Sequence, residues 1–358
     1  MHIINIQNKG RKEKMKKLFA ILLCACMLVA IVACDTPAKE AEYKLGMGIV
    51  VSMDSSAAGN AQVDATVATV VTDADGKIVA CRIDVAQNKM AVANGAVDTA
   101  KTFETKMELG SRYGMEGKID NDGNGVKLEW DAQAKAFEAW VVGKTVTEIK
   151  DMKTQEANGH TIAVDKDLLD AGCSMQITDF RDAVVKACND EQGMTFKTAA
   201  TFTLGVAAKT TAADSVAATA EANGTVCMYT DFAASVVADG KIIAALNDAI
   251  QPKITIDANG EIVEKTFKAT KRELKGEYGM APVKIDNDEN GVTKEWFEQS
   301  IEFSKFVVGK TAAEVEGLKT QEAKGHQISV DKELLDAGCS IQITGLQAVV
   351  AKAAKNAR

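Results

Sequence analysis

The sequence contains few of the residues from which common catalytic and metal centres are built. Only three histidines occur in 358 residues, and two of them, His160 and His326, follow a glycine at matching places. We find no HExxH pattern, no close Cys-x-x-Cys pair and no Ser-His-Asp order. One imidazole without a nearby nucleophile is a poor catalytic constellation. We therefore expect surface or turn histidines and no catalytic residues.

Long apolar runs are also scarce, and the clearest one, Leu18 to Ala33, lies near the start of the chain. It follows Lys16 and Lys17 and ends in small residues before Cys34, which predicts a secretory signal over residues 1–33 with translation from Met15. Val-Ala-Cys resembles a lipobox, so Cys34 is expected to be acylated, with residues 34–42 as a tether. An ordinary signal peptide with a chance cysteine is the alternative. The first interpretation predicts an extracytoplasmic protein held to the membrane by lipid.

Positive charge is scarce beyond this segment. Residues 1–33 hold six Lys or Arg and one acid, which leaves 36 basic and 49 acidic residues, a net charge of −13. Such a surface repels phosphates, so nucleic acid is not an expected partner. Five cysteines follow Cys34, an odd number with no metal-binding spacing, and they predict neither a disulfide framework nor a zinc site.

An internal repeat organises the rest of the chain. KIDNDGNGVKLEW returns as KIDNDENGVTKEW, and from Asp120 onward the two copies are offset by a constant 166 residues. We expect two tandem domains of normal size, residues 43–192 (the first repeat) and 193–358 (the second repeat).

Each repeat begins with residues typical of strands and continues with residues typical of helices. Val, Ile and Thr are frequent in Tyr43 to Ser52, Val63 to Thr72 and Lys77 to Val85, with the turn DADG before the last. The Asn-Gly pairs at 94–95 and 259–260 predict hairpin turns. Later, Thr145-x-x-Glu148 and Thr311-x-x-Glu314 predict capping boxes, Gly143 and Gly309 predict helix ends, and Thr178 is a candidate cap of the last helix. Strands followed by helices predict an α+β fold with antiparallel sheets.

The segment DNDGNG has the spacing of hard oxygen ligands before a sharp turn, which indicates calcium. Asx-Gly turns give the same letters without a metal. The candidate ligands in the two copies are Asp120, Asp122, Asn124 and Asp131, and then Asp286, Asp288 and Asn290. In the second copy the twelfth position is Phe297, which removes the closing carboxylate.

The stretch LLDAGCSMQIT, residues 168–178, returns almost unchanged as LLDAGCSIQIT at 334–344. It is either a cofactor site used twice or a structural turn and strand copied twice, and the second interpretation is favoured. The candidate cofactor residues are Cys173, Ser174, Gln176 and Thr178, with Cys339, Ser340, Gln342 and Thr344 in the second copy.

Taken together, these repeated blocks resemble a known family. TKMELGSRYGM and TKRELKGEYGM, each followed by Glu-Trp, a helix ending in VVGKT and an alanine-rich last helix, are similar to FMN-binding-type lipoproteins of Gram-positive bacteria, some of which are implicated in extracellular electron transfer. The resemblance implies two FMN-binding-like modules. Alternatives are a flavin-dependent electron carrier and a calcium-stabilised adhesion or solute-binding lipoprotein.

In flavin-carrying members of that family a transferase joins FMN to a threonine within Asp-x-x-Ser-Gly-Ala-Thr. Here Asp170 and Asp336 keep the aspartate of this pattern, but Gln176 and Gln342 stand where the threonine belongs. A carboxamide has no hydroxyl for a phosphoester, and Thr178 and Thr344 lie two residues too late. The resemblance therefore implies that any FMN is held without a covalent bond.

We predict that acid precipitation of the protein made in its native host leaves FMN in the supernatant, because neither glutamine can carry the nucleotide. Intact-mass spectrometry of the pellet checks this. An FMN-sized adduct on either repeat would contradict the prediction.

Overall fold

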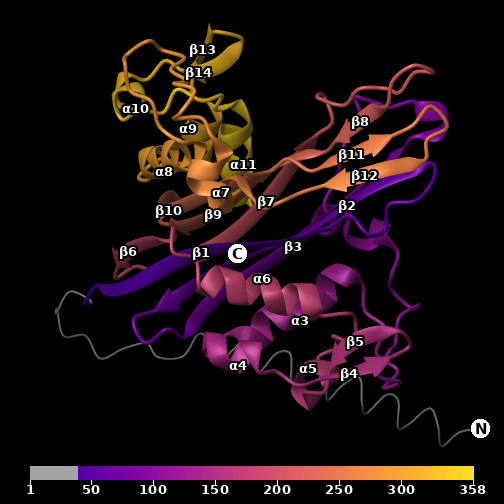
Figure 1. Ribbon diagram of the computed structural model, residues 1–358. Helices are drawn as coiled ribbons and strands as arrows, with labels where there is room; N and C mark the ends of the chain where they lie inside the picture. The colour runs from indigo at the N-terminus through magenta and orange to yellow at the C-terminus, as the bar shows by residue number, and fades with distance from the viewer. Residues whose placement is uncertain (1–38) are drawn as a thin grey trace, which may run out of the picture. The chain divides into compact units, whose positions relative to one another are not determined.

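The computed structural model describes residues 39–358, so the predicted signal peptide and Cys34 lie outside the described residues. The first strands form one antiparallel sheet (Figure 1). It contains β1 (Ala41–Ser52), β2 (Asn60–Asp73) and β3 (Ile78–Ala91), joined at its edge by β6 (Met194–Thr198), in the order β3-β2-β1-β6. The three strands predicted from sequence are all present. The edge strand β6 comes from the second repeat and pairs with β1 of the first.

The strands of the second repeat form two smaller sheets. One contains β7 (Thr203–Thr211), β9 (Tyr229–Ala238) and β10 (Lys241–Ile250) in the order β10-β9-β7. The other contains β8 (Gly224–Cys227), β11 (Lys253–Ile256) and β12 (Ile262–Thr266) in the order β12-β11-β8. All of these pairs are antiparallel, as in the predicted α+β class.

We call the β3-β2-β1-β6 sheet and the β10-β9-β7 sheet the two main sheets. Helices cover one face of each of them. In the first repeat α3 (Trp130–Val141) packs on β3, and α6 (Thr178–Cys188) packs on β1 and β2. In the second repeat α8 (Trp296–Phe306) packs on β10, and α11 (Thr344–Lys355) packs on β7 and β9. None of the helices among residues 39–358 is both long and apolar enough to span a bilayer.

Shorter elements connect these helices, and most occur at matching places in the two repeats. They are η1 (Ala93–Gly95), α2 (Lys106–Leu109), η2 (Gly110–Tyr113), α4 (Val146–Lys150), β4 (Thr154–Ala157), β5 (His160–Ala163) and α5 (Lys166–Asp170), followed by α7 (Lys271–Leu274), η3 (Lys275–Tyr278), α9 (Ala312–Glu316), β13 (Thr320–Ala323), β14 (His326–Ser329) and α10 (Lys332–Asp336).

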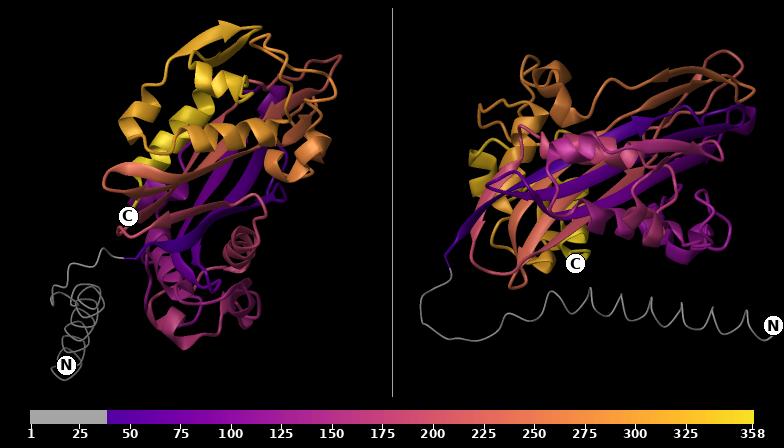
Figure 2. Two further views of the ribbon diagram at one scale, coloured as in Figure 1. Left: turned by 90° about the vertical axis from the view of Figure 1, so that its left-hand side faces the viewer. Right: turned by 90° about the horizontal axis from the view of Figure 1, so that it is seen from below.

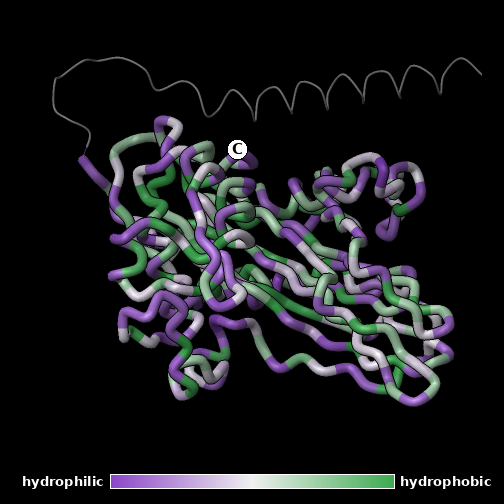
Figure 3. Tube along the Cα trace, turned by 90° about the horizontal axis from the view of Figure 1, so that it is seen from above, coloured by the Kyte–Doolittle hydropathy of each residue, from purple (hydrophilic) through white to green (hydrophobic). Residues whose placement is uncertain are grey.

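The two main sheets pack against each other through the faces that the helices leave open. Along β1 the residues Leu45, Met47 and Ile49 belong to one apolar cluster with Leu204 and Val206 of β7. Successive strand residues point to opposite faces, so the residues between them face the helices. The result is four layers, helices, sheet, sheet and helices, with helical layers on both outer sides (Figure 2). Hydrophobic strands run through the middle of the molecule (Figure 3).

Glycines let the outer helices approach their sheets closely. A Cβ on Gly46 would lie 2.0 Å from the carbonyl oxygen of Ala187 in α6. In the second repeat a Cβ on Gly205 would lie 1.9 Å from the carbonyl oxygen of Ala353 in α11. These distances are below contact, so both sheets need glycine where the last helix of the repeat crosses.

Local turn and cap predictions have mixed outcomes. Thr145 with Glu148 and Thr311 with Glu314 form the predicted capping boxes. The hairpin at 259–260 is present between β11 and β12. Asn94 instead lies in the 3₁₀ turn η1, so the hairpin predicted there is wrong. The last helix of the first repeat has Ile177 as its N-cap residue with no side-chain cap, so the predicted capping role of Thr178 is also wrong.

The five described cysteines are all free thiols, four of them buried and Cys188 partly buried. Cys173 and Cys339 lie in separate helix–sheet clusters, one in each repeat.

We predict that Gly205→Ala lowers the free energy of unfolding by about 1–3 kcal/mol, because the added methyl group forces α11 away from the sheet. Chemical denaturation measures the change. Gly276→Ala is the matched control, since no atom lies within 4 Å of its added Cβ. An equal, small effect of the two substitutions would contradict the close packing of α11.

Candidate functional site

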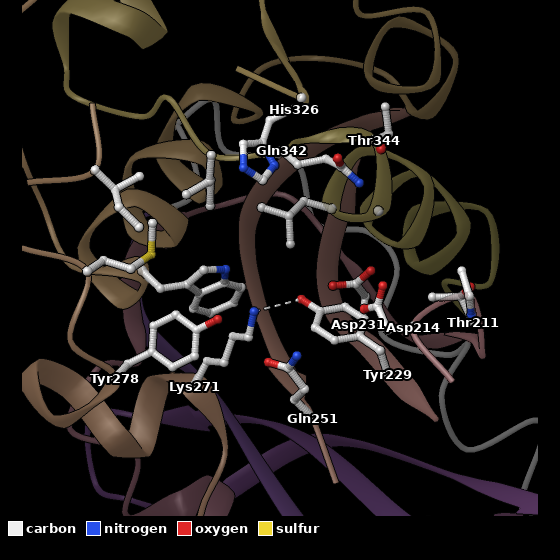
Figure 4. A pocket seen from close by; sticks show the side chains of 18 of the residues that line it. Thr211, Asp214, Tyr229, Asp231, Gln251, Lys271, Tyr278, His326, Gln342 and Thr344 are labelled. Carbon is white, nitrogen blue, oxygen red and sulfur yellow. Dashed lines mark hydrogen bonds between the residues drawn. The ribbon is translucent and has the colours of Figure 1, made fainter. Parts of the chain in front are cut away.

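A pocket of about 850 Å³ opens in the second repeat, at the end of its sheet (Figure 4). Its walls come from the ends of β7 and β9, from α7 and η3, from the first residue of α8, from the β13–β14 turn and from the start of α11. The residues that line the pocket include Lys209, Asp214, Tyr229, Asp231, Lys271, Tyr278, Trp296, His326, Gln342, Thr344 and Gly345.

The short helix α7 places Lys271 in this pocket. Thr270 caps the helix, and its hydroxyl and the Glu273 carboxylate form a capping box. The backbone N–H of Arg272, the second residue of α7, donates a hydrogen bond of 3.0 Å to Oδ1 of Asp248. These bonds fix the first turn of α7, so the long side chain of Lys271 is directed inward and is only 7% exposed.

Three aromatic rings surround the Lys271 ammonium. Its Nζ lies 4.7 Å from the ring centroid of Tyr229, 4.7 Å from that of Tyr278 and 5.2 Å from that of Trp296. These distances are within the range of cation–π attraction. The ammonium also donates a hydrogen bond of 3.2 Å to the hydroxyl of Tyr229. We call Lys271 with these three rings the aromatic cage.

A buried carboxylate lies beside the cage. Burial raises the pKa of Asp231 to about 6, and the Lys271 ammonium opposes this rise. Burial also raises the pKa of the Tyr229 hydroxyl well above its ordinary value, and Asp231 adds to that effect. Asp231 needs the space at Gly345, since a Cβ there would lie 2.2 Å from its Oδ2.

The opposite wall contains two of the sequence-predicted cofactor residues. Gln342 is exposed, and Thr344 is the partly buried first residue of α11. The N-cap residue of this helix, Ile343, makes no side-chain cap. A helix N-terminus with uncapped N–H groups favours negative charge. Together with the cage, the wall suits a planar aromatic ligand with an anionic group.

Four of the other predicted cofactor residues, Cys173, Ser174, Cys339 and Ser340, lie in the core and not in the pocket. Burial raises the pKa of the Cys339 thiol to about 12, and that of Cys173 likewise to about 12. The hydroxyl of Ser340 accepts the backbone N–H of Asn287, and that of Ser174 accepts the backbone N–H of Asn121. Cys339 and Ser340 thus belong to the fold around the pocket, and Cys173 and Ser174 belong to the matching part of the first repeat.

The copied stretch is mainly a structural corner. The Gln299 side chain accepts the backbone N–H groups of Ser340 and Ile341, at 2.8 and 3.1 Å. Gln133 does the same for Ser174 and Met175 in the first repeat. Residues 172–177 and 338–343 lie in no strand, so the expected strand is wrong, because these amides hold the backbone in place of a strand neighbour. In the first repeat Gln176 is exposed and donates to Thr178 at 3.4 Å.

Part of the predicted calcium ligand set comes together. Asp120 and Asp122, and likewise Asp286 and Asp288, each keep one buried Oδ1 without a hydrogen-bond partner. Proximity to Asp120 and partial desolvation raise the pKa of Asp122, with desolvation the larger cause.

The remaining predicted ligands are engaged elsewhere. Asp131 lies in the first turn of α3 and pairs with Lys135 at 2.6 Å. The Oδ1 atoms of Asn124 and Asn290 accept the backbone N–H groups of Val126 and Val292, as in Asx turns. Within residues 39–358 no group of three or more His, Cys, Asp or Glu side chains is arranged for a metal. Calcium binding stays a prediction.

Comparison with known proteins gives no further guide to the site. No family model, no curated protein and no solved structure matches the chain.

Lys271, Tyr229 and Asp231 were not identified from the sequence, although they form the centre of the site. The repeated TK-x-EL before Tyr-Gly-Met carried a usable signal, because Thr and Glu at that spacing form a capping box that fixes the intervening lysine. Tyr229 and Asp231 lie in a strand whose residues carry no comparable pattern.

We predict that ionisation of Asp231 lowers the free energy of unfolding as the pH rises from about 4 to about 6. Its folded pKa is raised from 3.8 to about 6, so ionisation in this window favours the unfolded chain. Asp231→Asn should remove about 2–3 kcal/mol of this pH dependence. Urea denaturation at several pH values measures the slope.

The matched control is Asp75→Asn in the exposed β2–β3 turn. The attraction between Lys271 and Asp231 exists only where Asp231 is ionised and is already part of its pKa, so the slope of stability against pH is the diagnostic quantity. An unchanged slope in Asp231→Asn would contradict the burial of this carboxylate.

Proposed function

We propose that the second repeat binds a planar aromatic anion of the FMN type without a covalent bond. The observation that carries the proposal is the aromatic cage, in which a buried lysine and three rings line a pocket that also contains Gln342 and Thr344. The resemblance to FMN-binding-type lipoproteins, noted from sequence, supports the same ligand class.

The size and lining of the pocket fit such a ligand. A volume of about 850 Å³ is within the range of small-molecule sites. Trp296, Tyr278 and Tyr229 offer ring surfaces on which a tricyclic ring can stack.

The buried Lys271 supports the anionic part of the ligand. The Lys271 ammonium is desolvated, so its attraction for a phosphate is stronger than that of a surface lysine. The N-terminus of α11 adds N–H donors on the opposite wall. Gln342 can donate a hydrogen bond through its amide but provides no nucleophile, which supports reversible binding.

We also propose that the protein acts at the outer face of the cytoplasmic membrane, held there by acylated Cys34. This rests on the sequence of residues 15–34, which precede the described residues. The proposed role is ligand binding, and catalysis is not part of this proposal. A role as an electron carrier would use the same pocket, since the redox chemistry is a property of the flavin.

We predict that the mature protein binds FMN at least tenfold more tightly than riboflavin, because only FMN carries the phosphate. Lys271→Met should remove most of this difference, since it deletes the buried charge. Calorimetric titration with both ligands measures the affinities.

The control is Lys268→Met, which removes a surface lysine three residues away that pairs with Glu277. Its FMN affinity should equal that of the unaltered protein. The absence of measurable FMN binding, or equal affinity in Lys271→Met, would overturn the proposed site.

A further inference from the structure

The first repeat contains a second lysine in the same local setting. Lys106 begins α2 behind a Thr105–Glu108 capping box, as Lys271 begins α7. Its Nζ lies 4.9 Å from the ring centroid of Tyr113 and 5.5 Å from that of Trp130. The cation and two of its aromatic neighbours thus recur, which makes the remaining differences between the repeats informative.

The strand pairing aligns the two surroundings residue by residue. Ile78 pairs with Thr72 and Ile242 pairs with Val237, each beside a bulge, so the two hairpins superimpose in register. In this alignment Asp64 of β2 corresponds to Tyr229 of β9, and Thr66 of β2 corresponds to Asp231 of β9. On the neighbouring strand Val50 pairs with Thr66 as Lys209 pairs with Asp231.

The carboxylate beside the lysine comes from different elements in the two repeats. In the second repeat it is Asp231 of β9, and Gly345 of α11 leaves room for it. In the first repeat Asp179 occupies the position of Gly345, 166 residues earlier, and the strand position is Thr66. A side chain at 345 and a carboxylate at 231 would collide, so the two arrangements exclude each other.

The exchange changes the local charge. Asp179 lies near both Lys106 and Asp64, because each of them affects the pKa of the Asp179 carboxyl. Partial desolvation raises the pKa of Asp179, the neighbouring Asp182 and Asp64 add to the rise, and Lys106 opposes it. The first repeat thus has one lysine and two carboxylates, with Val50 in place of Lys209. The pocket of the second repeat has Lys209 and Lys271 against Asp214 and Asp231, which balances its formal charge.

A larger side chain also lies over the indole in the first repeat. Phe180 takes the place of Leu346 and packs edge-on against Trp130, at 5.7 Å between ring centroids. Phe180 therefore fills more of the space beside Trp130 than the smaller Leu346 fills beside Trp296.

From this exchange we infer that the second repeat alone takes an aromatic anion, and that Asp64, Asp179 and Phe180 exclude such a ligand from the first repeat. The inference rests on the proposed function of the second repeat and adds a specificity rule to it. One aromatic anion is bound per chain, although the chain carries two copies of the lysine motif.

The test is calorimetric titration of the mature protein with FMN, which gives stoichiometry and affinity together. We expect one site per chain, a loss of at least tenfold in affinity for Lys271→Met, and no change for the matched variant Lys106→Met. Melting temperatures of both variants establish that they are folded. As a gain of function, Asp64→Asn with Asp179→Asn should improve FMN binding at the first repeat by at least tenfold and so reveal a second, weaker site.

The outcomes separate the two proposals. Two equivalent sites in the unaltered protein, reduced to one by Lys106→Met, would overturn this inference and leave the proposed function intact. No binding at either repeat would overturn the proposed function and the inference with it. One site that Lys106→Met removes and Lys271→Met leaves unchanged would place the ligand in the first repeat and overturn both proposals.

Discussion

The structure depends on the apolar contact between its two main sheets. Each sheet has helices on only one face, so an isolated repeat would expose the side chains of Leu45, Met47 and Ile49, or those of Leu204 and Val206. Facing each other, the two sheets remove both surfaces from water. The same constraint explains why β6, a strand of the second repeat, extends the sheet of the first. Two copies of one motif thus make a single compact unit over Glu40–Arg358.

This shared core also supports the pocket. Arg272, the residue after Lys271, is 4% exposed and pairs with Asp190 at the end of the first repeat at 3.1 Å. Gln192 donates its amide to the carbonyl of Arg272 and accepts the guanidinium at its own carbonyl. The connection between the repeats therefore holds α7 from behind, and the first repeat contributes to the site without lining it.

Local patterns in the sequence predicted local structure well. The strands, the capping boxes and the α+β class follow from side-chain chemistry within a few residues, and all appear in the structure. The Asn94-Gly95 turn was wrong because the chain there packs on the loop between β7 and β8, where a Cβ on Gly95 would lie 2.9 Å from the Cβ of Ala218. The cage could not be predicted, since Tyr229, Lys271 and Trp296 are brought together only by the packing of α7 and α8 on β10 and of β9 beside it.

The burial of the thiols has a consequence for how the protein is made. Five cysteines without a bond between them need no oxidising folding machinery, and thiols whose pKa is raised to about 12 contain almost no thiolate at neutral pH. For the five thiols of residues 39–358, folding in a reducing cytoplasm and folding after export should give the same covalent state. Cys188, partly buried at the end of α6, follows the same pattern, because burial raises the pKa of its thiol to about 11.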